Sequence, residues 1–341
     1  MRKLHWGVLG VAKIATVKVI PAMQRGEFTE ITAIASRQAD RAEAAALELG
    51  IPKAYGSYED MLADPEIDAV YIPLPNHMHV SWSTRAAEAG KHVLCEKPIG
   101  MNVRETLELI AARDRTGVTI GEAFMVQVHP QWERAVALVR EGRIGTLRSI
   151  VGTFGYFNAK PENIRNIREF GGGALMDIGC YPIKTSRMIF GEEPRRVSAT
   201  MDRHSAMGTD TKGTDILTSA ILEYPSGQCV FTCSTQIVPN QSVQIFGTAG
   251  RIDFEIPFNA VPGRVSKIRI DDGSDITGAA IQVEEFAPCD QYTLQGDRFS
   301  RAVLEHTPPP VPLEDSLRNM AAIDAIVRAA ETGRWEEPRY E

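Results

Sequence analysis

The sequence lacks the features that mark membrane proteins and nucleic-acid-binding proteins. Its 341 residues contain no run of about 18 apolar residues and no dense run of Lys and Arg. The formal net charge of −7 does not favour binding to nucleic acid or to an anionic membrane. The start, MRKLHWGVLGVAKIA, has the outline of a signal peptide, but Lys13 and Lys18 interrupt its apolar stretch.

Cysteine is scarce, and its spacing shows no pairing pattern. An odd number of cysteines without repeated spacing predicts buried thiols in a reducing compartment, so we expect a cytoplasmic protein. His77 and His79 have no Cys or carboxylate partner at metal-ligand spacing, so no metal is expected. Internal repeats and low-complexity tracts are also missing. The five cysteines are Cys95, Cys180, Cys229, Cys233 and Cys289.

The length predicts about two domains, and the pattern of the first half predicts a doubly wound domain. From residue 3 to about residue 123, short apolar runs alternate with segments of helical period, which is the pattern of βαβ units and a parallel sheet. We therefore expect an α/β protein with a doubly wound domain over residues 1–125. The runs are residues 4–9, 31–35, 69–72, 92–95 and 118–123.

After Pro130 the pattern changes to long stretches in which apolar and polar residues alternate. This alternation predicts a second domain over residues 126–312 that contains an antiparallel or mixed sheet of several strands. The segment SLRNMAAIDAIVRAAETG, near the end, predicts an amphipathic helix. We expect residues 313–341 to pack back on the first domain.

The first apolar run leads into GVLGVAKIA, a candidate phosphate-binding turn. Gly10, Ala12 and Ala15 occupy the three positions of a G-x-G-x-x-G/A fingerprint. Small residues there allow a pyrophosphate to approach the backbone, while the next helix directs its first amides at the charge. We expect Lys13 and Ile14 to belong to the same cofactor site. The alternative is an ordinary tight turn.

The end of the second run favours NADP over NAD. An NAD site places Asp or Glu there to bind the ribose 2′-hydroxyl, whereas this sequence has Ser36 and Arg37. A hydroxyl and a guanidinium suit a 2′-phosphate, and Arg41 would add a second cation. In the alternative interpretation Ser36 caps the helix and Arg37 is a solvated surface residue.

Two further strand ends carry polar groups, where ligands bind in open parallel sheets. One continues into PLPNHMH, where Pro73, Leu74, Asn76 and His79 are expected at the cofactor crevice. The other ends in Glu96 and Lys97, also expected there. A lysine beside a nicotinamide can bond a substrate oxygen, although a surface ion pair with Glu96 would have the same sequence.

The segment GGGALMDIGCYPI, residues 171–183, is the other candidate site. Asp177 and Tyr181 are four residues apart and would share one helix face. Pro182 would clash with the carbonyl of Ile178 inside a regular helix, which predicts a kink or a later helix start. In the alternative, Asp177 is a helix cap and Tyr181 a core aromatic.

These motifs, in this order, resemble the Gfo/Idh/MocA family of oxidoreductases along essentially the whole chain. The matching segments are GVLGVAKIA, PLPNHMH, CEKP, EAFMVQVHPQW, NIR and GGGALMDIGCYPI. Tyr181, where many members have His, is similar to the branch with NADP-dependent D-xylose dehydrogenase and dimeric dihydrodiol dehydrogenase. The resemblance implies an N-terminal Rossmann domain and a C-terminal α+β domain with a large open, mostly antiparallel sheet. It also implies NAD(P)-dependent chemistry on sugars or related alcohols and a homodimer, or dimer of dimers, formed through the second domain.

The resemblance also implies that Lys97, Asp177 and Tyr181 form the catalytic group. We expect Phe157 and Arg165 to contact the substrate with them, and His129 is a weaker candidate for the lining. We expect Tyr181 to take the proton of the hydroxyl on C1 of an aldose. It would need help from Lys97, because an unperturbed phenol has a pKa of about 10.

Two other functions remain open on the same residues. One is the reverse reaction, NADPH-dependent reduction of a keto-sugar or dicarbonyl; the other is a transcriptional regulator that binds the dinucleotide without catalysis. The sequence departs from the family in Val126, Gln127 and Val128, where relatives often have Tyr-Arg-Phe. That departure removes a cation.

Overall fold

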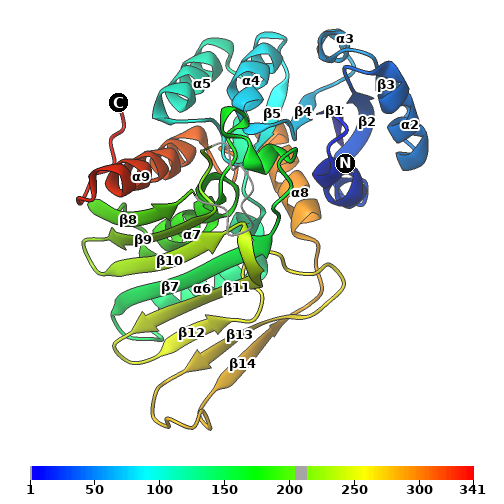
Figure 1. Ribbon diagram of the computed structural model, residues 1–341. Coiled ribbons are helices and arrows are strands. Elements are labelled where there is room, and N and C mark those ends of the chain that lie inside the picture. Colours follow the sequence, from blue (N-terminus) through cyan, green and yellow to red (C-terminus); the bar gives the residue numbers. More distant parts are fainter. Residues whose placement is uncertain (1, 204–212) are drawn as a thin grey trace. The chain divides into compact units, whose positions relative to one another are not determined.

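The computed structural model (Figure 1) describes residues 2–203 and 213–341, which form two compact units. The first unit comprises Met1–Val128 and Asp290–Leu317, and the second comprises His129–Cys289 and Arg318–Glu341. This division differs from the predicted domains, because residues 290–312 group with the first unit and residues 318–341 with the second.

The first unit is built on a six-stranded parallel sheet, which confirms the predicted doubly wound fold. Its strand order is β3-β2-β1-β4-β5-β6. The order reverses between β1 and β4, and a ligand crevice is expected beyond the carboxyl ends of these strands. The strands are β1 (Leu4–Leu9), β2 (Thr29–Ala35), β3 (Lys53–Tyr55), β4 (Ala69–Ile72), β5 (His92–Glu96) and β6 (Ile120–Ala123). The short edge strand β3 was not predicted because it has no apolar run.

Local signals set the ends of several helices in this unit. The side chain of Ser57 accepts a hydrogen bond from Asp60 N and caps α3, and Asn102 caps α5 in the same way. Gly50 and Gly117 end α2 and α5 in the left-handed conformation. The helical elements are η1 (Ala15–Val19), α1 (Ile20–Met23), α2 (Ala39–Leu49), α3 (Tyr58–Ala63), η2 (Asn76–Met78), α4 (His79–Glu88), α5 (Val103–Thr116), η3 (Met125–Val128) and α8 (Gln291–Leu304).

Helix α8 joins the first unit through contacts far apart in sequence. The indole of buried Trp6 in β1 donates a hydrogen bond to Ser300 Oγ at 3.1 Å and packs on Phe299. The carboxylate of Asp297 accepts hydrogen bonds from the backbone N–H groups of Glu27 and Phe28. These contacts place α8 against the parallel sheet, although the chain reaches it only after the second sheet.

The second unit contains an eight-stranded sheet in the order β14-β13-β12-β11-β7-β10-β9-β8. Within this second sheet, only β7 and β10 pair in parallel among the described residues, so the prediction of a mostly antiparallel sheet is confirmed. The strands are β7 (Leu147–Phe157), β8 (Arg196–Asp202), β9 (Leu217–Glu223), β10 (Gln228–Ser234), β11 (Gln236–Gly247), β12 (Arg251–Phe254), β13 (Ser266–Asp271) and β14 (Gln282–Phe286).

Helices α6 (Pro130–Arg140) and α7 (Cys180–Phe190) lie along one face of this sheet (Figure 1). A Cβ on Gly152 would lie 3.6 Å from Pro182 of α7, so even-numbered residues of central β7 face the helices. The face opposite exposes Val151 and Ile221. The shorter helical elements of the unit are η4 (Ile164–Asn166), η5 (Arg168–Phe170) and η6 (Leu175–Gly179).

The last long helix, α9 (Leu313–Thr332), starts in the first unit and continues in the second. Glu314 pairs with Arg113 at 2.7 Å within the first unit. Further along, the side chain of Asn319 donates to the carbonyl of Cys180, and Glu336 forms a β-bridge with Val197, both within the second unit. These contacts explain why residues 318–341 do not group with the first domain as predicted.

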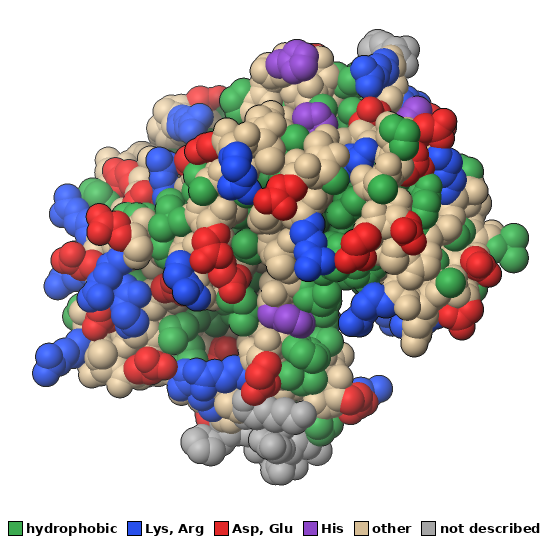
Figure 2. Space-filling model, turned by 90° about the horizontal axis from the view of Figure 1, so that it is seen from above, with side chains coloured by type: hydrophobic (Ala, Val, Ile, Leu, Met, Phe, Trp, Pro, Cys, Tyr) green, Lys and Arg blue, Asp and Glu red, His purple; other side chains and the backbone are tan. Residues whose placement is uncertain are grey.

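Across residues 2–203 and 213–341, no helix combines the length and the apolar character needed to cross a membrane. On the face drawn in Figure 2, acidic and basic side chains are interspersed rather than gathered by sign. None of the five cysteines forms a disulfide, and four of them are buried, as predicted; Cys289 is partly exposed.

Candidate active site

The turn after β1 has the geometry of a phosphate-binding loop. Gly10 has φ +106°, a conformation that favours glycine, and a Cβ there would lie 3.0 Å from Leu74 Cδ2. The chain turns helical at once, since Thr16 N donates to Ala12 O at 3.0 Å. Ala12, Lys13 and Ile14 therefore lie in the first turn, whose N–H groups have no partner within their own helix. These groups suit a pyrophosphate.

Two arginines and a tyrosine surround the carboxyl end of β2. Ser36 Oγ accepts a hydrogen bond from Gln38 N at 3.2 Å, while Gln38 itself is the N-cap residue of α2, so Ser36 supports the turn rather than capping the helix. Burial raises the pKa of Tyr58, and the guanidinium groups of Arg37 and Arg41 act in the opposite direction. Arg37 is also a hydrogen-bond partner of the Tyr58 hydroxyl.

Tyr58 links this cationic end to the phosphate loop. Its hydroxyl oxygen lies 3.5 Å from the position that a Cβ on Gly10 would take. The Tyr58 ring is buried and packs edge-on against Trp82, with centroids 4.8 Å apart. The sequence analysis missed Tyr58, because an aromatic residue at the start of a short helix carries no signal of cofactor binding.

The loop after β4 is tied to the loop after β5 by His79. The two ring nitrogens of His79 lie 2.8 Å from Pro98 O and 2.7 Å from Leu74 O. The side chain is 1% exposed, and burial lowers its pKa to about 4, so the ring is neutral near pH 7 and donates to one carbonyl at a time. The expectation that His79 faces the crevice is therefore corrected: it positions two loops.

The other residues predicted in the loop after β4 differ in exposure. Pro73 and Leu74 are buried, and Asn76 is partly exposed at the start of η2. Of this group, Asn76 is the residue with a polar side chain that reaches the surface.

Lys97, partly exposed, follows β5 in a loop held by two carboxylates. Glu96 accepts hydrogen bonds from the Tyr71 hydroxyl at 2.6 Å and from Lys97 N at 3.3 Å. Burial, with the Glu96 charge second, raises the pKa of Tyr71 well above its usual value. Buried Glu122, on the neighbouring strand β6, accepts from Ile99 N at 2.8 Å. The sequence analysis did not identify Glu122, which lies inside an apolar run.

In the second unit, Asp177 is held by two donors. The hydroxyl of Tyr156 and the Nε of Arg165 both donate to Asp177 Oδ2, at 2.6 and 2.9 Å. The Asp177 side chain is 15% exposed and that of Arg165 is 42% exposed. Burial, with the Asp177 charge second, raises the pKa of Tyr156 well above its usual value. Arg165, which was expected at the substrate, thus contacts Asp177, and Tyr156 is a partner that the sequence analysis did not identify.

The glycine run before Asp177 accommodates the protein's own atoms. A Cβ on Gly172 would lie 2.5 Å from Arg165 O, and one on Gly173 would lie 2.1 Å from Asp215 Oδ1. Gly173 N also donates to Arg165 O at 2.8 Å, so the run docks the loop that carries Arg165. The close approach inferred from the three glycines therefore has a structural explanation within this unit.

Asp215 fixes the start of the helix that carries Asp177. Its Oδ2 accepts hydrogen bonds from Leu175 N at 2.8 Å and from Thr218 Oγ1 at 2.7 Å. Burial raises the pKa of this carboxyl, and the hydrogen bonds act in the opposite direction. Asp215 thus has the capping role that the alternative interpretation gave to Asp177. It lies 40 residues from Leu175, so no local pattern could reveal it.

The helix accommodates Pro182 by widening one turn before it. Residues Leu175–Gly179 form a π-helical turn, η6, and the regular helix α7 begins at Cys180. A π-turn removes the usual i→i−4 pattern where the proline ring would clash, which is the predicted irregularity.

Tyr181 is 5% exposed and packs against both Phe154 and Phe258, with ring centroids 5.5 and 5.4 Å away. Phe154 and Tyr156 alternate onto one face of β7, so Tyr181 and Asp177 contact the same strand face. Phe157 is 53% exposed and points to the opposite face. Phe157 therefore lies on the strand face away from Asp177, and its contact with the substrate stays a prediction.

Comparisons with known proteins agree along the chain. Residues 4–124 match the model of the oxidoreductase family with an NAD-binding Rossmann fold, GFO_IDH_MocA, and residues 132–253 match the GFO/IDH/MocA C-terminal domain. The chain is 49% identical to the uncharacterized oxidoreductase ORF334 of Rhizobium meliloti, over 98% of this chain and 99% of that one. It is 40% identical to D-xylose 1-dehydrogenase (NADP(+)) 2 of Haloferax volcanii, over 97% and 98%.

Two solved structures are similar over nearly the whole chain. Aldose-aldose oxidoreductase from Caulobacter crescentus, complexed with glycerol, has a TM-score of 0.89 and 28% identity over 98% of this chain and 100% of that one. KijD10, a 3-ketoreductase from Actinomadura kijaniata in complex with NADP and TDP-benzene, has a TM-score of 0.87 and 30% identity over 96% and 98%.

Proposed function

Because the chain belongs to the Gfo/Idh/MocA family of oxidoreductases, we propose that it is an NADP-dependent dehydrogenase that oxidises C1 of an aldose to give a lactone. The observation that carries this proposal is Asp177, held by Tyr156 and Arg165 on the helix that also carries Tyr181. A carboxylate oriented in this way suits a sugar hydroxyl. The 40% identity with a D-xylose dehydrogenase supports the substrate class.

NADP is the proposed cofactor because the first unit fits it. Gly10 leaves no room for a side chain in the phosphate turn, and Arg37 and Arg41 lie at the end of β2, where an NAD site would have an acidic residue. Guanidinium groups bind a 2′-phosphate with complementary charge. We place the pyrophosphate at Gly10 and residues 12–14, the 2′-phosphate at Ser36, Arg37 and Arg41, and the nicotinamide half near Pro73, Leu74, Asn76, Glu96 and Lys97.

We assign the proton chemistry to Lys97 and Tyr181, acting on the same substrate hydroxyl. Tyr181 removes the hydroxyl proton, and the ammonium of Lys97 stabilises the phenolate and bonds the substrate oxygen. Asp177 and Arg165 orient a second hydroxyl of the sugar. The bound nicotinamide accepts the hydride in this direction and supplies it in the reverse direction.

The reverse reaction, reduction of a keto-sugar or dicarbonyl with NADPH, is the second candidate. It is supported by the similarity to KijD10, a 3-ketoreductase crystallised with NADP. The regulator alternative loses its support, because the named relatives are oxidoreductases. The free cysteines are consistent with the cytoplasmic setting that we propose.

NADPH formation with a panel of aldoses tests the proposal directly. Lys97→Met and Tyr181→Phe are each expected to lower kcat/KM by roughly 10²- to 10⁴-fold, the usual contribution of a general acid or base. Lys267→Met and Tyr340→Phe are matched controls, since both residues lie at the surface of the second unit. Wild-type turnover in both site variants would disprove the assignment of Lys97 and Tyr181.

We also propose that the open sheet face forms a homodimer. Val151, Val230 and Ile221 are neighbours across β7, β10 and β9 on the face away from α7, and Val151 and Ile221 are more than a third exposed. Burial of such a row would stabilise a pair of sheets packed face to face. Light scattering should give twice the chain mass, or four times for a dimer of dimers; a monomeric mass would contradict the proposal.

A further inference from the structure

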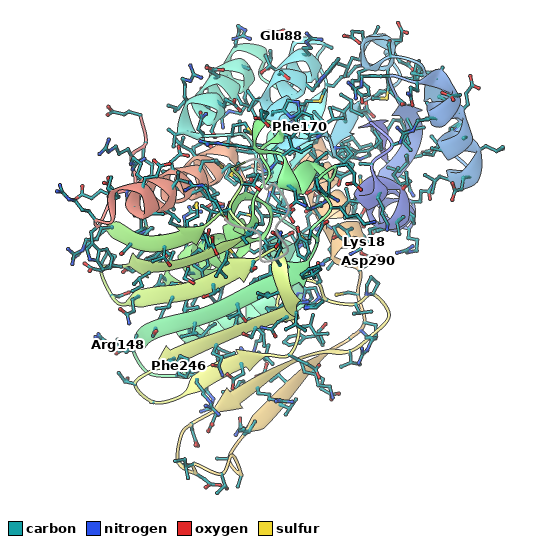
Figure 3. The ribbon with its side chains drawn as sticks, viewed as in Figure 1. Lys18, Glu88, Arg148, Phe170, Phe246 and Asp290 are labelled. Carbon is teal, nitrogen blue, oxygen red and sulfur yellow. The ribbon has the colours of Figure 1, made fainter. Side chains whose placement is uncertain are left out.

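The thiol of Cys289 lies beside a buried histidine at the boundary of the second unit. His129 and Cys289 are the first and last residues of the segment that forms most of this unit. Cys289 Sγ lies 3.5 Å from His129 Nε2, and the next residue, Asp290, is labelled in Figure 3. His129 is 1% exposed, whereas Cys289 is partly exposed and the other four cysteines are buried.

The hydrogen bonds of His129 define which ring nitrogen carries the proton. His129 is the N-cap residue of α6, and its Nδ1 accepts a hydrogen bond from Gln131 N at 3.3 Å. A nitrogen that accepts from a backbone N–H has no proton of its own, so the proton of the neutral ring is on Nε2. Burial lowers the pKa of His129 to about 4, and the ring is therefore neutral near pH 7. The Nε2–H group is directed at Cys289 Sγ.

This arrangement favours the thiolate over the thiol. A sulfur anion accepts a hydrogen bond from Nε2–H more strongly than a neutral sulfur does. Two carboxylates act against the thiolate. Glu133 also acts to raise the pKa of His129, and the charge of Asp290, the next residue, is offset by its pair with Arg25 at 2.7 Å. Protonation of Nδ1 would break the bond from Gln131 N, so His129 stabilises the thiolate by a hydrogen bond and not by a full imidazolium charge.

We propose that Cys289 is an activated thiol that is modified by low-molecular-weight disulfides. Its thiolate attacks one sulfur of the disulfide, a bond forms between Cys289 Sγ and that sulfur, and the original S–S bond breaks. The other half leaves as a thiolate and takes up the proton that Cys289 released. No electrons are gained or lost overall, and the site does not depend on the proposed dehydrogenase activity.

The modification is expected to be selective because the remaining cysteines are buried. Burial raises the pKa of Cys229 to about 12 and raises the pKa values of Cys95 and Cys233 well above their usual range. Buried neutral thiols react slowly because the thiolate is the nucleophile. One adduct per chain, at Cys289, is therefore expected in the folded protein.

The test is the reaction of the full-length native protein with 5,5′-dithiobis(2-nitrobenzoate), followed from pH 5 to pH 9. One equivalent of coloured thiolate should be released, with a rate midpoint roughly one unit below the value of about 8.5 for an unperturbed thiol. Cys289→Ser should abolish this reaction, and peptide mass spectrometry should place the adduct on Cys289.

The matched variant is His129→Asn. Asn can still accept from Gln131 N and cap α6 but has no Nε2–H group. The rate midpoint of this variant should return to about 8.5. At pH 7 its reaction should be only about threefold slower than that of the wild type, because a thiolate of higher pKa is less abundant but more nucleophilic. A wild-type midpoint at or above 8.5, or an adduct on another cysteine, would overturn the proposal, and both can be measured even if His129→Asn does not fold.

Discussion

The loop that carries Lys97 and the helix that carries Asp177 are each held by a buried carboxylate that accepts a backbone hydrogen bond. In the first unit, Glu122 accepts a hydrogen bond from Ile99 N, two residues after Lys97. In the second unit, Asp215 accepts one from Leu175 N, two residues before Asp177. In both, a buried carboxylate binds the backbone beside a proposed catalytic residue, and a charged acceptor gives a stronger hydrogen bond than a neutral one.

The two carboxylates differ in what brings each of them to the backbone group that it binds. Glu122 lies opposite Cys95 in the neighbouring strand, so the register of the parallel sheet alone brings it beside the loop. Asp215 reaches the helix only because Gly173 leaves space for its carboxylate. The strand end is thus determined by sheet topology, whereas the helix start depends on one long-range contact. We expect the helix to be the more sensitive of the two.

The largest effect is expected from removing the anchor of the helix. Asp215→Ala leaves Leu175 N–H and Thr218 Oγ1 without their acceptor and should lower the free energy of unfolding by about 3 kcal/mol. Asp215→Asn retains an acceptor oxygen and should lose less. Urea denaturation of the three proteins measures both values. Equal losses of unfolding free energy in the two variants would show that the acceptor oxygen at position 215 does not stabilise the helix.

The pH dependence of the same pair tests the buried charge. Burial raises the folded-state pKa of Asp215 above the ordinary value of 3.8. Between pH 3.8 and the folded-state pKa, the folded protein therefore binds the proton more tightly than the unfolded chain does. The contribution of Asp215 to stability therefore increases as the pH falls through its folded pKa towards 3.8. Asn does not titrate. The stability of the wild type relative to Asp215→Asn should rise on acidification, and a constant difference would exclude the shift.

A smaller effect is expected from the anchor of the Lys97 loop in the first unit. His79→Phe removes the donor that serves Pro98 O and Leu74 O, which should lower the free energy of unfolding by about 2 kcal/mol. It should also lower kcat, because the loop that carries Lys97 is displaced. His77→Phe, an exposed position two residues earlier, is the control. If both variants behave alike, His79 does not hold the two loops.

This contrast also explains what the sequence could predict. The ends of β1, β2, β4 and β5 were found correctly because buried strands of a parallel sheet are apolar runs, and topology places ligands at their carboxyl ends. Tyr58, Tyr156 and Asp215 were missed because each acts through a contact with residues distant in the chain. The glycine run was recognised as a point of close approach, but the identity of the approaching group required coordinates.

A third effect concerns cofactor choice in the first unit. Arg37→Asp replaces a cation with the carboxylate typical of NAD sites and should lower the NADP/NAD ratio of kcat/KM by at least about tenfold, or about 1.4 kcal/mol. Arg41→Asp should have a smaller effect, and Arg104→Asp, exposed on α5, should have none. The ratio is measured by initial rates with each cofactor. An unchanged ratio in Arg37→Asp would remove the basis for assigning NADP.

The smallest effect is expected at the exposed side of the Asp177 cluster. Arg165→Gln removes the Arg165 donor to Asp177 Oδ2, but the Arg165 side chain is 42% exposed, so solvent limits its contribution to less than about 1 kcal/mol. KM for the sugar should rise no more than about fivefold, with kcat little changed, because Tyr156 still orients the carboxylate. Arg168→Gln, exposed in η5, is the control. A collapse of kcat in Arg165→Gln would mean that Arg165, and not Tyr156, determines how Asp177 is held.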